Sequence, residues 1–217
     1  MTLVIADVLL QLSLNPGAVY KYAVVREFRE PDGSGQIRYS EDWTFTVEPG
    51  TGGKRKVKVT SLLRQSVFDG TVVPSTDNVP TQWSEERAFN GQVVSRDPDL
   101  YFPVLRGRQW RPLDVKFSPD TVAVGSTWEW DKPADPDAEL SAALWKWTLS
   151  AATESEATLT LAFAERGTDK AVTADGTIRI DRKDGWPTAI DVTVRNTEVP
   201  GDEEHSVVNL HVTWKRV

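Results

Sequence analysis

The chain has 217 residues, of which 39% are hydrophobic and 26% charged, and its formal net charge at pH 7 is −7. This composition is typical of a folded globular protein and excludes a disordered chain. An acidic chain also lacks the positive field that nucleic acid binding requires. Cysteine is absent, which excludes disulfides, zinc–thiolate sites and cysteine nucleophiles. No apolar run approaches the roughly 18 residues of a membrane-spanning helix.

The first 17 residues, MTLVIADVLLQLSLNPG, contain an apolar stretch that lacks the features of a signal peptide. The stretch has no basic start, Asp7 interrupts it, and no small-x-small cleavage motif follows. We therefore expect residues 8–14 to form a first strand. Its apolar face would carry Val8, Leu10, Leu12 and Leu14.

Most of the chain alternates apolar and polar residues with the period of two that predicts strands. In residues 188–195, for example, Ile190, Val192 and Val194 share one face. The other predicted strands cover residues 20–28, 37–47, 57–67, 156–163, 177–180 and 206–216. Antiparallel sheets with one face in water give this pattern. We expect a mainly β protein, with a strongly curved antiparallel sheet or open barrel of roughly ten strands and at most one or two short helices.

Glycine, often preceded by asparagine or aspartate, separates the predicted strands, as hairpin turns require. Predicted turns include Asn90-Gly91, Asp175-Gly176 and Asp184-Gly185. The one predicted helix covers residues 135–144, with Asp135 as its N-cap and a proline at its first position.

Residues 97–119 carry four prolines and show no clear period, which indicates a long crossover. The crossover divides the chain into residues 1–96 and 120–217. Both parts contain a Gly-x-x-aromatic-charge-aromatic pattern, at residues 17–22 and 125–130. We expect one β domain over residues 1–217, and two similar halves remain an open interpretation.

Two tryptophan pairs, in WEW at residues 128–130 and WKW at residues 145–147, predict a hairpin. Rings two residues apart lie on the same face of a strand. A single antiparallel register pairs Trp128 with Trp147, Glu129 with Lys146, and Trp130 with Trp145. Aromatic and opposite-charge pairs across strands each contribute about 0.2–1 kcal/mol, so this register is well specified. The aromatic face belongs either to a packed core or to an apolar cleft for a lipid or glycan.

Other residue patterns predict no specific chemistry. Residues 49–56, PGTGGKRK, lack the hydroxyl residue and following helix of a phosphate-binding loop. His205 and His211 share a strand face but lie about 20 Å apart, too far for joint metal ligation. The acidic loop of Asp131, Asp135, Asp137 and Glu139 lacks the spacing of a calcium loop. The sequence thus predicts no catalytic residue, no metal site and no cofactor.

Three segments carry a family resemblance: LQLSLNPGAVYKY at 10–22, VAVGSTWEW at 122–130 and GTIRIDRKDGWPTAI at 176–190. They resemble uncharacterised exported bacterial proteins that are similar to the outer-membrane lipoprotein-carrier (LolA-like) group. The resemblance implies a curved antiparallel sheet around an apolar cavity that holds acylated ligands. The chain departs from that group by its proline-rich crossover and by the near absence of a helical pattern.

The leading hypothesis is non-catalytic binding of an apolar or amphipathic ligand, such as a lipid or acyl group, in the bacterial cell envelope. The location would be periplasmic or extracellular, after removal of a signal peptide, and a cytoplasmic location stays open. The predicted lining residues are Trp128, Trp130, Trp145, Trp147, Trp43, Tyr20 and Tyr22. The alternatives are a structural or protein-interaction module without a small ligand and, third, a glycan or ester hydrolase.

Overall fold

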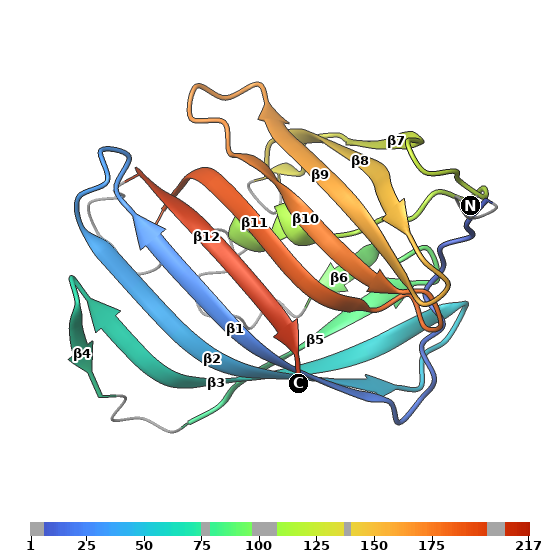
Figure 1. Ribbon diagram of the computed structural model, residues 1–217, viewed down its shortest axis with the longest axis horizontal. Helices are drawn as coiled ribbons and strands as arrows, with labels where there is room; N and C mark the ends of the chain where they lie inside the picture. The colour runs from blue at the N-terminus through green and yellow to red at the C-terminus, as the bar shows by residue number, and fades with distance from the viewer. Residues whose placement is uncertain (1–6, 75–78, 97–107, 137–139, 199–206) are drawn as a thin grey trace, which may run out of the picture.

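A computed structural model describes residues 7–74, 79–96, 108–136, 140–198 and 207–217 (Figure 1). These residues form twelve strands and a short 3₁₀ helix, η1, and residues 108–110 directly before η1 are α-helical. The strands are β1 (Val19–Arg29), β2 (Gln36–Glu48), β3 (Lys54–Phe68), β4 (Thr71–Val73), β5 (Thr81–Ala88), β6 (Val93–Arg96), β7 (Thr127–Lys132), β8 (Ala142–Ala152), β9 (Glu156–Arg166), β10 (Thr173–Asp181), β11 (Pro187–Glu198) and β12 (Val207–Arg216). The helix η1 spans Arg111–Leu113.

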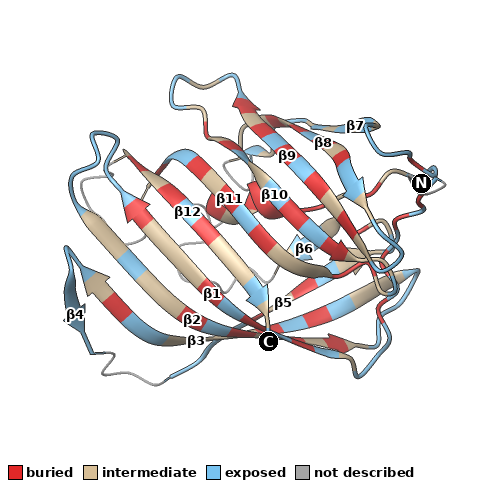
Figure 2. Cartoon of the chain, in the orientation of Figure 1, coloured by how far each residue is buried: buried red, intermediate tan, exposed pale blue. Residues whose placement is uncertain are grey.

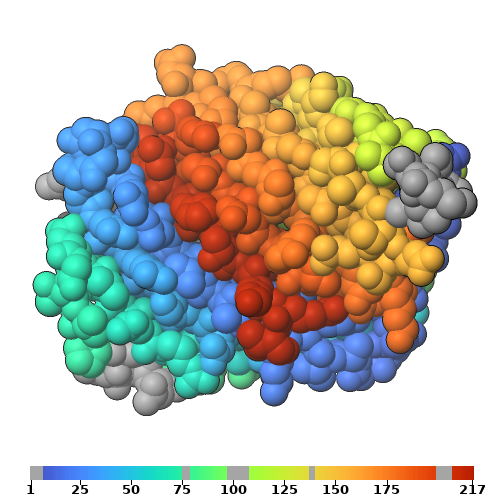
Figure 3. Space-filling model, in the orientation of Figure 1, coloured from blue at the N-terminus to red at the C-terminus, as the bar shows by residue number. Residues whose placement is uncertain are grey.

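All twelve strands belong to one antiparallel sheet with the order β6-β5-β3-β2-β1-β12-β11-β10-β9-β8-β7, and β4 pairs with β3. The strands before and after the crossover meet where β1 pairs with β12. Figure 3 shows these two strands side by side on the surface of the molecule. In the described part of the chain β6 and β7 do not pair, so the sheet stays open. The predicted curved, open antiparallel sheet is confirmed, with two strands more than expected.

The apolar residues of each strand gather on one face of the sheet, as their alternation predicts. Figure 2 shows buried and exposed positions alternating along β8 to β12. On β8, the buried positions Ala143, Trp145, Trp147 and Leu149 are fully enclosed. When apolar residues alternate with polar ones along every strand, the sheet has one apolar face, and the sheet covers that face by curving around it. The core therefore lies inside the curve of the sheet.

The N-terminal segment at residues 8–14 alternates in burial as predicted, but it is not a strand of the sheet. Its one bridge joins Val8 to Val122, through hydrogen bonds of 2.8 and 2.9 Å. Farther along, the Ser13 N–H donates to the carbonyl of Asp184. A Cβ on Gly185 would lie 2.1 Å from the carbonyl oxygen of Gln11, so this turn requires glycine. The segment crosses the turns at the end of the sheet and does not extend the sheet edge.

Two local predictions are wrong. Asp175-Gly176 is not a turn, because both residues lie within β10. A Cβ on Gly176 would lie 2.2 Å from the carbonyl oxygen of Asp191 on β11, so glycine here allows a close approach of strands. The predicted helix at 135–144 is also wrong over residues 140–144, because Leu140 bridges to Asp135 and β8 begins at Ala142; Pro136 has 3₁₀ geometry, and residues 137–139 are not described.

The described end of the predicted crossover, residues 108–119, lies inside the curve of the sheet. In Figure 1, η1 is seen behind β10, β11 and β12. Trp110 contacts Trp43 on β2 and Trp214 on β12, while Arg111 stacks over Trp145 on β8. The crossover therefore covers part of the inner face.

Within the described residues, no helix is both long and apolar enough to cross a membrane.

Candidate functional site

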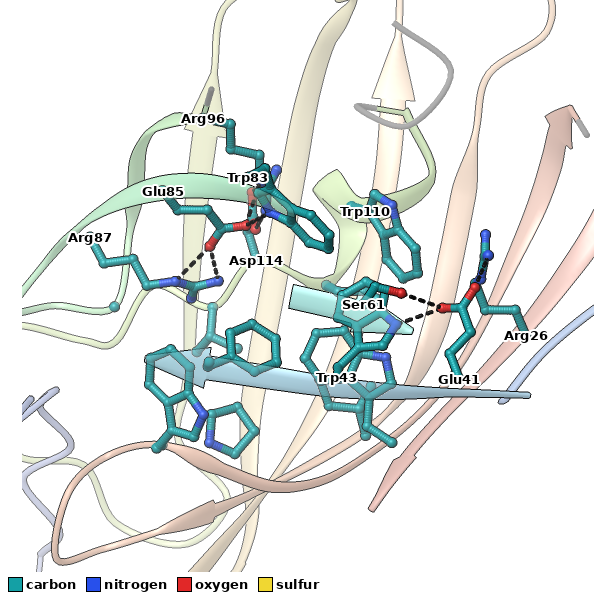
Figure 4. Close-up of a pocket in the computed structure, with 18 of the residues that line it drawn as sticks. Arg26, Glu41, Trp43, Ser61, Trp83, Glu85, Arg87, Arg96, Trp110 and Asp114 are labelled. Atoms are coloured by element: carbon teal, nitrogen blue, oxygen red, sulfur yellow. Dashed lines mark hydrogen bonds and ion pairs between the residues drawn. The ribbon is translucent and has the colours of Figure 1, made fainter. Parts of the chain in front are cut away.

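A pocket of about 240 Å³ opens on the inner face of the sheet, beside the crossover (Figure 4). Its walls come mainly from β1, β2, β3, β5, β11 and β12, from the turn before β11 and from residues 110–117, and β6 and β10 contribute one residue each. The lining residues are Leu12, Arg26, Tyr39, Glu41, Trp43, Phe45, Ser61, Leu63, Val79, Thr81, Trp83, Glu85, Arg87, Gly91, Arg96, Trp110, Leu113, Asp114, Val115, Phe117, Ile180, Gly185, Trp186, Pro187, Ile190 and Trp214.

Trp43 is the centre of the aromatic wall. Its ring lies 5.1 Å from that of Trp83, 5.0 Å from that of Trp110 and 5.2 Å from that of Trp214, centroid to centroid. The contacts are tilted or edge-on, which is the favoured geometry for aromatic pairs. Trp43 itself is buried, whereas Trp110 and Trp214 are only partly buried. The wall therefore combines a fixed centre with rings that remain accessible.

A buried carboxylate supports the aromatic wall from β2. Glu41 lies two residues before Trp43 on the same strand face, and its Oε2 accepts a hydrogen bond from the Trp43 indole at 2.5 Å. The guanidinium of Arg26 on β1 pairs with the same carboxylate. Arg26 also stacks on the ring of Trp110 at 5.6 Å. Figure 4 shows this group on one side of the pocket.

A second buried carboxylate, Glu85 on β5, lies on the other side of the pocket in Figure 4. It accepts hydrogen bonds from Arg87 at 2.7 and 3.0 Å and from Arg96 at 3.0 Å. The indole of Trp83 donates to it at 3.3 Å. Arg96 also pairs with Asp114, which follows η1, so the group joins the sheet to the crossover.

The positive and negative side chains of the described lining are equal in number. Three guanidinium groups, of Arg26, Arg87 and Arg96, lie among three carboxylates, of Glu41, Glu85 and Asp114. Each guanidinium has a carboxylate partner within the pocket. The pocket therefore presents aromatic surface and internally neutralised polar groups, and no unpaired charge for an ionic ligand.

Burial and ion pairing shift the two carboxylates that share Arg96 in opposite directions. Burial raises the pKa of Glu85, but the nearby guanidiniums of Arg87 and Arg96 outweigh burial and hold that pKa at about 2. For Asp114, burial raises the pKa and Arg96 offsets only part of the increase. Two guanidiniums contact Glu85 and one contacts Asp114, which accounts for the difference.

These shifts predict an acid-dependent loss of stability through Glu85. Because folding lowers the pKa of Glu85 from its ordinary value of 4.5, its stabilising effect is complete above that value and is lost as pH falls towards 2. Asp114 has the opposite sign, since its ionisation in the folded state reduces stability as pH rises through its raised pKa. We expect the difference in free energy of unfolding between wild type and Glu85→Gln to shrink steadily below pH 4.5. Urea unfolding at a series of pH values measures this difference, and a constant difference down to pH 3 (about 1.5 units below the ordinary value) contradicts it.

The tryptophan hairpin has the predicted register. Trp128 pairs with Trp147, Glu129 with Lys146, and Trp130 with Trp145. The ion pair between Lys146 and Glu129 spans 3.8 Å on the exposed face.

The aromatic face of this hairpin lies against the crossover and outside the lining of the pocket. Trp145 is fully enclosed, stacks on Trp130 at 4.6 Å and donates its indole N–H to the carbonyl of Arg111. The indole of Trp128 donates to the carbonyl of Lys116. Residues 111–116 of the crossover therefore pack against this aromatic face.

Of the three remaining residues that the sequence predicts to line a ligand site, one lines this pocket and two pack behind its lining. Trp43 lines the pocket, whereas Tyr20 and Tyr22 do not. Tyr20 stacks on Trp186 at a centroid distance of 5.0 Å, and Tyr22 packs against Trp214 at 5.7 Å. The two tyrosines hold lining residues in place from the adjacent core.

Sequence reasoning missed four lining tryptophans and the three buried carboxylates of the lining, Glu41, Glu85 and Asp114. The missed rings are Trp83, Trp110, Trp186 and Trp214. A signal for part of the site was present, because Glu41-Asp42-Trp43 and Trp83-Ser84-Glu85 each place a carboxylate and an indole on the same strand face. A carboxylate that shares a buried face with tryptophan needs a donor, and the indole supplies one.

In the described part of the chain, the other patterns noted in the sequence form no second site. His211 is exposed and lies 2.9 Å from the carboxylate of Asp191, while His205 lies outside the described residues. In the acidic loop, Asp131 pairs with Arg166, and residues 137–139 are not described. Over the parts of the chain that are described, no group of three or more histidine or acidic residues is placed to hold a metal ion.

Comparison with known proteins gives similarity of structure only. No family model matches the sequence, and no curated protein matches it either. The fold is similar to a lipovitellin chain from a structure of lipid–protein interactions, with a TM-score of 0.59 and 10% identity. The match covers 94% of this chain and 25% of that one, so this chain spans a quarter of the lipovitellin length.

A second solved structure is a candidate lipoprotein from Parabacteroides distasonis ATCC 8503. The alignment covers 93% of this chain and 97% of the other, at 9% identity and a TM-score of only 0.30, which supports no argument about fold or function. The lipovitellin match shows that the open, curved antiparallel sheet of this chain is an architecture found in a lipid-associated protein.

Proposed function

We propose that this protein binds an apolar or amphipathic ligand, a lipid or acyl group, in the pocket around Trp43. The observation that carries the proposal is the pocket of about 240 Å³ on the inner face of the sheet, with five tryptophans in its lining. Sites for small apolar ligands are concave, aromatic-rich and supplied with a few placed polar groups. The likeness of the sheet to lipovitellin and the sequence resemblance to the LolA-like group both support a lipid as the ligand.

The internal pairing of the lining charges supports an apolar ligand over an ionic one. A charged ligand would have to give up its hydration in a pocket whose guanidiniums and carboxylates already neutralise one another. An apolar group has no such cost and gains about 25 cal/mol for each Å² removed from water. The proposed place of action is the bacterial cell envelope, where carriers of acyl groups need such a pocket.

Filling the pocket with a larger side chain tests this function. Leu63 on β3 lines the pocket, whereas its neighbour Leu62 does not. We expect Leu63→Trp to weaken binding of an apolar fluorescent dye at least tenfold (about 1.4 kcal/mol), because the indole occupies the space of the ligand. Leu62→Trp, the matched control on the adjacent position, should bind the dye within about twofold of wild type.

Native mass spectrometry of the wild-type protein from a bacterial host supplies the direct measurement. A co-purified lipid that is retained by Leu62→Trp and lost from Leu63→Trp supports the proposal. Equal dye binding by the two variants, with no lipid on the wild-type protein, would falsify it.

One observation favours the alternative of a protein-interaction module. The sheet order ends at β6 and β7, which leaves one edge of each strand unpaired within the described residues. Open edges offer backbone hydrogen bonds to another chain. A stable oligomer in light scattering, together with no dye binding in either leucine variant or the wild type, would favour this module over the ligand-binding function.

A further inference from the structure

Exposed apolar side chains gather around the short strand β4. Ten large hydrophobic residues are exposed in the described part of the chain, and four of them lie within twelve positions: Phe68, Val72, Val73 and Val79. Figure 2 shows β4 exposed along its whole length. Single exposed apolar residues are ordinary on a protein surface, but a group of them marks an interaction site.

The pocket opens beside this group. Among its described lining residues only Val79 and Thr81 are exposed, so its mouth lies at the start of β5. β4 and β5 pair with the same edge of β3, where Val73 is opposite Ser66 and Thr81 is opposite Ser61. Five positions of a strand span about 17 Å, so β4 lies that far along the edge from the mouth.

The inner face of the sheet continues from the pocket to β4. Tyr39, which lines the pocket, is opposite Ser66, and Ser66 is opposite Val73 on β4. The ring of Phe68 lies edge-on to that of Tyr39, with 6.3 Å between their centroids. An apolar chain leaving the pocket in this direction therefore meets Tyr39, Phe68 and Val73 in turn.

The hairpin of β3 and β4, residues 66–73, is apolar on both of its faces. Adjacent residues of a strand point to opposite faces, so Val73 faces inward and Val72 faces outward, opposite Val67. A flat partner surface covers only one of these faces, whereas a lipid interface surrounds a tip that enters it. The tip has one charged side chain, Asp69, which is turned back to accept a hydrogen bond from the Gln36 N–H at 2.7 Å.

The backbone of β4 is poorly suited to adding a strand from a protein partner. The strand has three residues and is followed by Pro74, which has no N–H to donate. Strand addition depends on a row of free backbone donors and acceptors. The exposed area of this hairpin is therefore mainly side-chain hydrocarbon.

A guanidinium lies beside the apolar tip. Arg38 on β2 is exposed, and it is opposite Val67, which is opposite Val72, so its Cα lies about 10 Å from that of Val72. Arg38 makes no ion pair with a described residue, because Glu27, its neighbour on β1, pairs with Arg29. A guanidinium at this distance from a buried tip reaches the phosphates of lipid headgroups.

We infer that the hairpin of β3 and β4 docks on a zwitterionic phospholipid surface, with Val72 and Val73 in the apolar boundary and Arg38 at the headgroup phosphates. The net charge of −7 opposes docking on an anionic surface. Docking in this way places the mouth of the pocket at Val79 beside the lipid. This inference goes beyond the proposed function, because it concerns the surface at which the protein works and not the occupant of the pocket.

Co-sedimentation with phosphatidylcholine vesicles tests the docking. The wild-type protein should bind the vesicles, and the double variant Val72→Asp with Val73→Asp should bind at least tenfold more weakly, because it loses apolar area and brings two carboxylates to the boundary. The matched control is Val19→Asp with Val124→Asp, since these valines are 51% and 52% exposed and do not line the pocket. The control should bind within about twofold of wild type.

Three results of this experiment overturn the inference. They are absence of vesicle binding by the wild type, an equal loss in the two double variants, and full binding by the β4 variant. A stable dimer in light scattering that only the β4 variant dissociates, without vesicle binding, assigns the hairpin to a second copy of the chain and also overturns the inference.

A fluorescent label reports which part of the protein enters the lipid. Because the chain has no cysteine, Val72→Cys supplies a single site for a nitrobenzoxadiazole label. Its emission should move to shorter wavelength on addition of phosphatidylcholine vesicles, whereas the same label at Val124→Cys should not change. No shift at position 72, or an equal shift at position 124, overturns the inference.

The charge of the vesicles tests the kind of surface. Binding to phosphatidylglycerol vesicles should be no tighter than to phosphatidylcholine, since the chain is acidic. Binding to phosphatidylcholine should change less than about threefold between roughly 0.1 and 0.5 M NaCl, because apolar contacts are not screened by salt. Tenfold tighter binding to phosphatidylglycerol, lost at the higher salt, overturns the choice of a zwitterionic surface.

The failures of the inference and of the proposed function are distinguishable. A wild-type protein that binds the apolar dye but no vesicles keeps the proposed function and loses the docking surface. One that binds vesicles but not the dye keeps the docking surface and loses the proposed function. The β4 double variant should still bind the dye within about twofold of wild type, because Val72 and Val73 do not line the pocket.

Discussion

Glu85→Gln is expected to lower the free energy of unfolding by about 3–5 kcal/mol, the usual effect of breaking a buried ion pair from one side. The side chain of Glu85 is 5% exposed and contacts two guanidiniums, of Arg87 and Arg96. Glutamine keeps the size of the side chain but removes the charge, so among the described residues Arg87 loses its carboxylate partner and Arg96 keeps that of Asp114. Urea unfolding at pH 7, followed by tryptophan fluorescence, measures the difference.

The neighbour Glu86 supplies a matched control for this prediction. Its carboxylate is 48% exposed and pairs with Lys54 at 3.5 Å. An exposed pair of this kind contributes about 0–1 kcal/mol, so Glu86→Gln should change stability by no more than that. Equal effects of the two substitutions would show that the buried cluster of Glu85 does not hold β5 to the crossover.

Trp145→Ala is expected to lower the free energy of unfolding by about 3–5 kcal/mol, as large-to-small substitutions of buried aromatic residues do. The ring of Trp145 is fully enclosed between Trp130, Phe163 and the guanidinium of Arg111. Its removal leaves a cavity and also frees the carbonyl of Arg111 from its indole donor. Thermal and urea unfolding both measure the loss.

Lys146→Ala, one residue away on the exposed face, is the control for the tryptophan substitution. It removes only the 3.8 Å pair with Glu129 and should cost less than about 1 kcal/mol. A Trp145→Ala protein with wild-type stability and greatly weakened dye binding would contradict the packing of this ring and would support a ligand on the hairpin face instead.

The strands of the fold could be predicted from sequence because the physical signal is local. Alternation along residues 188–195 and 206–216 specifies which side chains face inward, and the structure has β11 over the first range and β12 over residues 207–216 of the second. The register of the tryptophan hairpin followed from the fact that one alignment satisfied two aromatic pairs and a charge pair together.

The pocket could not be predicted in the same way, because it depends on distant parts of the chain. Trp110 meets Trp43 only because the described end of the crossover, residues 108–119, lies against the inner face of the sheet. Sequence spacing carries no information about this approach, since the crossover has no period of its own. The same segment decides which aromatic face is covered: it packs on Trp145 and leaves Trp43 beside the pocket.

Propensity also failed where tertiary contact decides the backbone. Asp175-Gly176 has the composition of a turn, yet its glycine serves the close approach of β10 to β11. Likewise, Asp135 and a following proline favour a helix start, but Asp135 bridges to Leu140 ahead of β8. At Gly176 the pairing of β10 with β11 outweighs the local preference, and at Asp135 an isolated bridge to Leu140 does so.

The pairing of β1 with β12 has a consequence for how the protein folds. Val24 on β1 is paired with Trp214 on β12, 190 positions later in the chain. Contacts between residues so far apart form late, because a long loop must close before they contribute. Until β12 arrives, the inner strand β1 presents a bare edge to other chains, and newly made molecules are at their most prone to aggregate. A chaperone that holds the chain during this interval would therefore protect the edge of β1 above all.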